Sequence, residues 1–115
     1  MSIVIVIIHK EIVNVYWVQG VQISHRIMQL GGTPIMDPSK LLQISGCGYK
    51  EPPSDPNNLK QVIQEVLDAE ACAIETYNKL AEKYRITNLV THEKFEDLLE
   101  DEVDDEEQWQ KLAGI

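Results

Sequence analysis

The sequence predicts an all-α fold in which three long helices and a long crossover form a helical bundle that is incomplete in one chain. Apolar residues recur at three- and four-residue steps over residues 59–84 and again over 89–112, the pattern of a helix with one buried face. Residues 31–57 hold all five prolines and most of the glycines, so they form a long connection. With 115 residues, 43% hydrophobic and 25% charged, residues 1–115 are expected to form a single domain.

The first half of the chain is the less regular one. Residues 1–9 are rich in β-branched side chains and favour a short strand, although a helix continuing into the next segment fits the same residues. Residues 10–30 are predicted to be helical and to end before Gly31 and Gly32, because glycine suits the residue that follows a helix. Gly20 and several valines weaken this helix.

The second half is dominated by a helix hairpin. Within the crossover, a short helix over residues 39–44 is expected, since Asp37 can cap it and Pro38 suits its first turn. The hairpin itself is predicted over residues 58–84 and 88–112, with an asparagine or threonine available to cap each helix. A third helix covers only part of the wide apolar face of such a hairpin. Either residues 1–9 or a second chain must therefore cover the rest.

The chain is strongly acidic, with a formal charge of −9 and a pI near 4.6. Nine of the twelve residues from 96 to 107 are Asp or Glu, and most of these must be a solvated surface. This charge argues against direct binding to nucleic acid or to anionic membranes and makes metal cations the natural partners. The longest apolar run, residues 3–8, is too short to span a membrane, so a cytoplasmic location is expected.

Two glutamates interrupt the apolar faces of the last two helices at matching heights. If the hairpin folds back about Ile86, then Glu70 and Glu102 lie side by side, because 86 − 16 = 70 and 86 + 16 = 102. Burying two carboxylates together is costly unless a cation lies between them. The sequence therefore indicates a metal site inside the hairpin. The alternative is that both glutamates lie at the edge of their helix faces and reach water.

Three motifs in the chain resemble those of the ferritin-like superfamily, in particular bacterioferritin-like and Dps-like proteins. Residues 70–78 match E-x-x-A-I-x-x-Y-N, residues 101–109 match D-E-x-x-H-E-E-Q-W except for Asp105 at the histidine position, and residues 26–34 match R-I-x-x-L-G-G-x-P. Their order and spacing resemble the third helix, the fourth helix and the end of the second helix of that family. The separation of Cys47 and Cys72 further resembles the thioferritin branch, in which a cysteine pair flanks the di-iron centre.

The resemblance implies a carboxylate-bridged di-iron site in a four-helix bundle, with Glu from two helices and Glu-x-x-His from the other two. Glu70 would be the metal ligand from the third helix, and Glu102 the bridging glutamate of the fourth. Asp105 occupies the histidine position and would be an oxygen ligand one turn after Glu102, shifting the site toward harder cations. Tyr77 lies on the face of Glu70 and would hydrogen-bond a metal carboxylate, although a core tyrosine fits there equally well.

The first half departs from the family pattern. The Glu-x-x-His of the second helix falls on Tyr16 and Gln19, seven residues before Arg26, and neither side chain is a usual iron ligand. The first helix, with its own glutamate, is missing. Residues 1–20 are therefore interpreted as a degenerate or truncated version of the family's N-terminal half, and the chain as retaining half of a di-iron site.

The function implied by the resemblance is iron binding, with oxidation of ferrous iron by oxygen or peroxide and storage of the ferric product in a cage. A ferroxidase activity or peroxide detoxification would follow only from a complete site. The competing hypothesis is a non-catalytic helical assembly module that kept the ferritin-like packing and lost the site. In both cases a homo-oligomer, a dimer or larger, is expected.

The two cysteines are expected to lie beside the site. Cys72 follows Glu70 by two positions, which turns it about 200° around the helix and away from the ligands. If the crossover folds Cys47 back, the two Cα atoms come within the roughly 4.4 to 6.8 Å of a disulfide, and the pair would be redox-active. The alternatives are two ordinary buried thiols, or Cys47 in a loop without a fixed partner.

Overall fold

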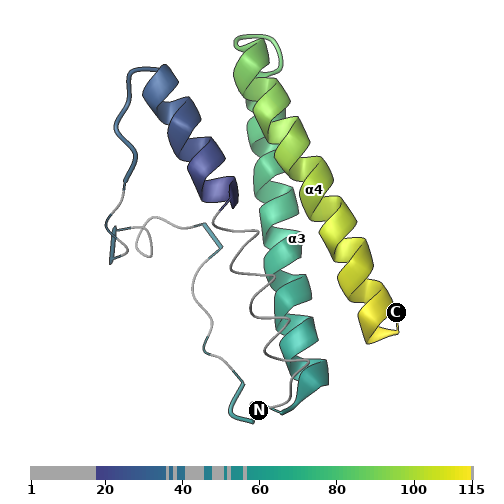
Figure 1. The fold of residues 1–115 in the computed structure, drawn as a ribbon. Coiled ribbons are helices and arrows are strands. Elements are labelled where there is room, and N and C mark those ends of the chain that lie inside the picture. The colour runs from purple at the N-terminus through teal and green to yellow at the C-terminus, as the bar shows by residue number, and fades with distance from the viewer. Residues whose placement is uncertain are drawn as a thin grey trace.

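A computed structural model of the chain describes residues 18–35, 37, 39–40, 46–47, 51, 53–55 and 57–114. Helix α3 (Leu59–Tyr84) and helix α4 (Leu89–Ala113) lie side by side as an antiparallel hairpin (Figure 1). Residues 18–29 form a third helical stretch, called here the 18–29 helix, beside the half of the hairpin that carries the turn. No strand occurs in the described part of the chain, so the all-α fold is confirmed.

Local sequence signals explain where the helices of the hairpin begin and end. The side chain of Asn58 accepts a hydrogen bond from the backbone N–H of Gln61, and that of Asn88 accepts one from Thr91. Each asparagine thereby satisfies a donor that the first turn would otherwise leave unpaired. Helix α4 ends at Gly114, whose φ of 78° lies in the left-handed region that glycine adopts at low cost.

The 18–29 helix also ends at a glycine. Gly31 has a φ of 84°, and the backbone N–H groups of Gly31 and Gly32 donate to the carbonyls of Met28 and Ile27. These bonds satisfy carbonyls left open at the helix end. The predicted strand over residues 1–9, the helix before residue 18 and the short helix after residue 40 lie outside the described residues.

Arg26 ties the 18–29 helix to the start of α4. Its Nε donates to Thr91 Oγ1 at 3.0 Å, and its Nη2 donates to Asn88 Oδ1 at 3.0 Å. Thr91 is buried, so one of these bonds is shielded from competing water. Gln19 lies seven residues before Arg26, about 10 Å along the helix axis, and this anchor therefore helps to set where Gln19 meets the hairpin.

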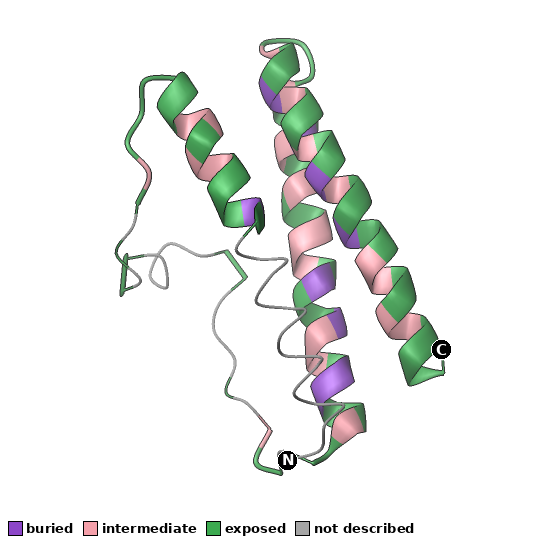
Figure 2. Cartoon of the chain, in the orientation of Figure 1, coloured by how far each residue is buried: buried purple, intermediate pink, exposed green. Residues whose placement is uncertain are grey.

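The core lies on the facing sides of the helices, where the buried residues of α3 and α4 meet (Figure 2). Its buried apolar side chains among the described residues are Val62, Ile63, Leu67, Ala81 and Leu98. Phe95 extends this core, with its ring 6.1 Å from that of Tyr77 and 6.3 Å from that of Tyr84. Within the described chain, no helix is both long and apolar enough to cross a membrane.

Candidate metal centre

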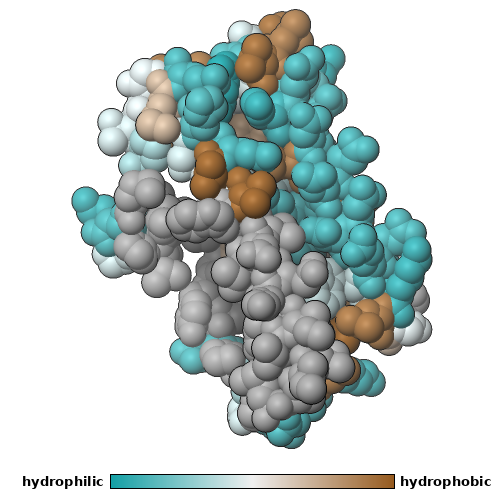
Figure 3. Space-filling model, viewed as in Figure 1, coloured by the Kyte–Doolittle hydropathy of each residue, from teal (hydrophilic) through white to brown (hydrophobic). Residues whose placement is uncertain are grey.

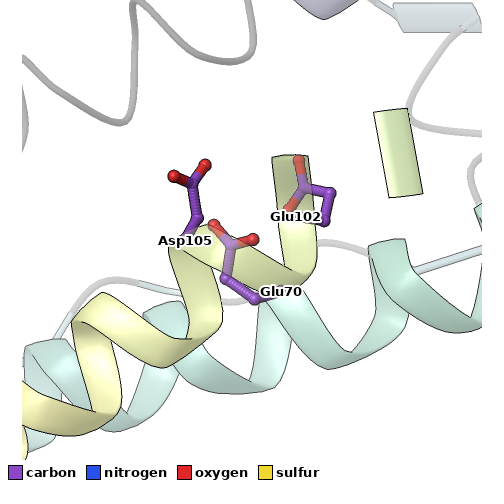
Figure 4. Close-up of side chains that lie close together, drawn as sticks. All are labelled: Glu70, Glu102 and Asp105. Carbon is purple, nitrogen blue, oxygen red and sulfur yellow. The ribbon is translucent and has the colours of Figure 1, made fainter. Parts of the chain in front are cut away.

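Glu70 and Glu102 meet inside the hairpin, on the same faces as the apolar core. Glu70 is 3% exposed and Glu102 is completely buried. Asp105 follows one turn after Glu102 and is half-buried. One oxygen from each of the three carboxylates lies within 4.8 Å of the other two. Figure 4 shows the three side chains gathered together, Glu70 from α3 and the other two from α4.

Two oxygen atoms of this cluster have no hydrogen-bond partner in the described part of the chain. Glu70 Oε2 and Glu102 Oε2 are buried and accept no hydrogen bond from any described residue. A buried carboxylate oxygen without a donor costs stability, and here two such atoms belong to neighbouring groups of like charge. The arrangement suits a cation bound between the carboxylates, because a cation would satisfy both atoms at once.

The pKa of Glu70 is raised by its burial among other acidic groups. Burial raises the pKa of Glu70 to about 9, helped by the adjoining Glu102 and by the negative charges of Asp105 and Glu106. Without a cation, Glu70 therefore keeps a proton at neutral pH. A divalent ion at the cluster would favour the carboxylate form and displace this proton.

The stability of the metal-free protein is therefore expected to fall as the pH rises. The pKa of Glu70 increases from 4.5 to about 9 on folding, so the native state binds the extra proton over this interval. The contribution of Glu70 is fully present below pH 4.5 and is lost as the pH approaches 9. In metal-free buffer the urea midpoint should be lower at pH 9 than at pH 5. The E70Q variant should lose this dependence, and an unchanged wild-type midpoint would contradict the expectation.

Gln19 is the site residue that the sequence analysis left without a role. It lies on the 18–29 helix and is only 5% exposed. Its Nε2 donates a hydrogen bond to Glu102 Oε1, so the 18–29 helix closes over the glutamate pair. Because glutamine is not a usual iron ligand, the residue type alone did not indicate a role at a metal site. The signal was its position seven residues before Arg26, where the family pattern has a histidine.

Tyr77 reaches the site through Gln19. Its hydroxyl donates to Gln19 Oε1 at 3.2 Å, while its ring packs near Phe95 in the core. Burial, followed by the charges of Glu102 and Glu70, raises the pKa of Tyr77 to about 12. The hydroxyl thus keeps its proton and acts as a hydrogen-bond donor at all ordinary pH values.

The cysteines form a disulfide on the flank of the site. Cys47 and Cys72 are joined, with their Cα atoms 5.9 Å apart. Cys72 belongs to α3, two residues after Glu70, whereas Cys47 belongs to the crossover. The bond therefore ties the crossover to the helix that carries one of the carboxylates. The structure places Cys47 against α3, unlike the alternative of a loop without a fixed partner.

A hollow of about 440 Å³ opens beside the cluster. Gln19 and Asp105 line it together with two further acids, Asp101 and Asp104. Most of the acidic run is exposed on the surface of α4, as expected. His92 lies elsewhere: its Nδ1 contacts the carbonyl of Ala81 at 2.6 Å, and it is a structural residue of the hairpin.

Of the comparisons with known proteins, the one with protein families gives a match. The model of the family described as ferritin-like domain matches residues 10–114, a range that includes the 18–29 helix, α3 and α4. No curated protein and no solved structure matches the chain significantly. The match extends over nearly the whole sequence and includes all of the carboxylates of the cluster.

Proposed function

Since this chain belongs to the ferritin-like family, we propose that it binds ferrous iron through Glu70, Glu102 and Asp105. The observation that carries the proposal is a pair of buried carboxylate oxygens, Glu70 Oε2 and Glu102 Oε2, that accept no hydrogen bond from the described residues. Both belong to a cluster whose ligand atoms lie close enough for one ion to contact all three residues. The protein would thus place iron inside the hairpin, away from bulk water.

The cluster resembles part of a di-iron centre. A complete centre of this type takes a Glu from each of two helices and a Glu-x-x-His pair from each of the other two. Here α3 supplies Glu70, and α4 supplies Glu102 with Asp105 in place of histidine. Carboxylates are suitable ligands for ferrous iron, and their negative charge also favours the ferric product. Glu70 would release its proton to solvent when iron binds.

The activity proposed for this site is iron oxidation linked to storage or to removal of peroxide. In the peroxide reaction, two ferrous ions each give one electron to hydrogen peroxide, which takes up two protons and leaves as two water molecules. The protein's part is to hold the iron on charged oxygen ligands in a buried site. If the chain binds iron only weakly, the non-catalytic assembly module becomes the better description.

Anaerobic titration of ferrous iron into chelator-stripped protein tests the proposal. We expect a saturable heat of binding with a fixed stoichiometry per chain, because the cluster is a single defined site. Release of protons to the buffer should accompany binding near neutral pH, since Glu70 is protonated beforehand. Only weak uptake that added salt suppresses would instead show non-specific binding to the acidic surface and would contradict the proposal.

We also propose that the protein is a homo-oligomer, a dimer or a larger assembly such as a cage. Apolar side chains gather at the tip of the hairpin (Figure 3), where Ile86 is 82% exposed, Leu89 66% and Val90 51%. A cluster of exposed apolar side chains is typical of surfaces that bind another protein. Sedimentation at micromolar concentration should show a species larger than one 13.1 kDa chain, and a folded monomer would contradict this.

A further inference from the structure

We propose that Gln19 is a fourth ligand of the bound metal, through its amide oxygen, and that the resulting all-oxygen donor set suits hard divalent cations such as Mn²⁺ as well as Fe²⁺. This inference rests on the proposed function, because it concerns the same site. It departs from the histidine that the family pattern has at this position. The inference adds a residue from the 18–29 helix to a cluster otherwise made by the hairpin.

The first support is the position of the amide. Gln19 is 5% exposed, and its Nε2 donates to Glu102 Oε1. An ion bound by Glu102 would therefore lie next to this amide. An amide N–H carries partial positive charge and would be repelled by a cation, whereas the amide oxygen would be attracted. The amide is thus expected to turn over when a cation binds, so that its oxygen takes the place of Nε2 on the side of Glu102.

The second support is that the hydroxyl of Tyr77 can hydrogen-bond to the Gln19 amide in either of its two orientations. Its hydroxyl now donates to Gln19 Oε1 at 3.2 Å. A hydroxyl can also accept a hydrogen bond, so after a half-turn of the amide it would accept from Nε2. The turn replaces the bond from Gln19 to Glu102 with a bond from Gln19 to the metal. It leaves the contact with Tyr77 in place, and no buried polar atom of Gln19 loses its partner.

The third support is access from solvent. Gln19 and Asp105 both line the hollow beside the cluster, and the fully buried Glu102 lies behind Gln19. An ion that arrives through the hollow would meet these two side chains before it reaches Glu102. The carboxylate of Asp105 would attract the ion, and the amide of Gln19 would turn to receive it.

The chemical consequence concerns metal preference. Together with Gln19, the cluster would offer three carboxylates and one amide oxygen. Carboxylate and carbonyl oxygens suit Mn²⁺ and other hard cations, whereas imidazole suits zinc, copper, nickel and iron. A histidine at position 19 would therefore shift the balance between these two groups of metals.

Electron paramagnetic resonance of bound Mn²⁺ provides the test, because it detects nitrogen coordinated to the metal. The stripped wild-type protein loaded with Mn²⁺ should show no coordinated nitrogen, and Q19H should show one. Calorimetry should find Mn²⁺ binding to Q19L weakened by about tenfold, the lower end of the effect of removing a supporting residue at a metal site. Q19H should raise the ratio of Zn²⁺ to Mn²⁺ affinity by a similar factor. The control is V21H, at an exposed residue of the same helix that does not line the hollow, which should show neither change.

Several results would overturn the inference. They are a coordinated nitrogen in the wild type, none in Q19H, unchanged Mn²⁺ affinity in Q19L, or a V21H variant that behaves like Q19H. Failure of the proposed function is distinguishable, because either the wild type would bind Mn²⁺ only weakly or tight binding would survive in E102Q. If E102Q loses the ion but the Gln19 variants give one of the contrary results, only the role of Gln19 is wrong.

Discussion

Changing Glu70 and Glu102 together to glutamine is expected to abolish tight binding of ferrous iron while leaving the hairpin folded. Glutamine has nearly the shape of glutamate, so the packing around both positions is kept. The change removes two of the three carboxyl groups of the cluster and leaves only Asp105. A single half-buried carboxylate is too weak a ligand to hold a divalent ion tightly. Anaerobic calorimetry with ferrous iron should show no saturable binding.

The same variant should be at least as stable as the metal-free wild type above neutral pH. Glutamine cannot ionise, so the cost of a buried charge at Glu70 disappears. Each new amide also carries an NH₂ donor in place of one carboxylate oxygen, so the two facing side chains can hydrogen-bond to each other. Urea unfolding in metal-free buffer measures this effect and, at the same time, shows that lost iron binding is not the result of misfolding.

The matched control changes two exposed acids of the same helix, D97N together with E100Q. This variant loses the same formal charge, so it tests whether the overall acidity of the chain accounts for binding. Its iron stoichiometry should equal that of the wild type. Glu96 is avoided because it lies 3.0 Å from His92 in the hairpin. Equal iron binding by E70Q/E102Q and the wild type would show that the buried carboxylates are not the site.

The hairpin and its carboxylates could be predicted from sequence because they depend on local periodicity. Glu70 and Glu102 fall within apolar faces, and the turn at residues 85–87 places the point of reversal at Ile86. Equal distances along two antiparallel helices then bring the two side chains together, whatever the rest of the chain does. Periodicity left open whether they reach water, and the structure buries both.

Gln19 could not be assigned in the same way. Its contact with Glu102 depends on how the 18–29 helix docks on the hairpin, and that docking involves hydrogen bonds from Arg26 to Asn88 and Thr91. Arg26 lies 62 and 65 positions before Asn88 and Thr91, and this contact follows from no periodic pattern. A glutamine also has no chemistry that indicates a metal by itself. Only the distance from Arg26 in the family motif could have identified it.

The path of the crossover, which the disulfide fixes, could not be predicted from the sequence either. Two cysteines on a chain permit a single pairing, but periodicity does not specify the path of a proline-rich connection. The bond in the structure requires the crossover to return to α3 beside Glu70. The pKa of Glu70 is likewise a property of the folded state, because it depends on burial and on three acids of α4. Sequence thus predicts which groups are present, and tertiary structure decides how they act on one another.

Reduction of the Cys47–Cys72 disulfide is expected to lower the free energy of unfolding by about 3 to 4 kcal/mol. The bond joins residues 25 positions apart, and closing a loop of this length removes a corresponding amount of entropy from the unfolded chain. Such a loss is large beside the roughly 5 to 15 kcal/mol of a typical domain. Urea unfolding with and without a phosphine reductant measures it. The C47A/C72A variant, which has no bond to lose, should be insensitive to the reductant.

The redox role proposed for the pair requires more than this stabilisation. In the cytoplasm, the location we propose, thiols are mostly kept reduced, so the pair would start open and close when peroxide rises. Closure transfers two electrons from the two thiols to peroxide and yields a disulfide and two waters. Mass spectrometry of reduced protein after mild peroxide treatment should then show an intramolecular Cys47–Cys72 peptide. Independent oxidation of the two thiols, with no linked peptide, would exclude this role. The proposed iron site would be unaffected by that result, because Cys72 is turned about 200° around α3 from Glu70, away from the carboxylates.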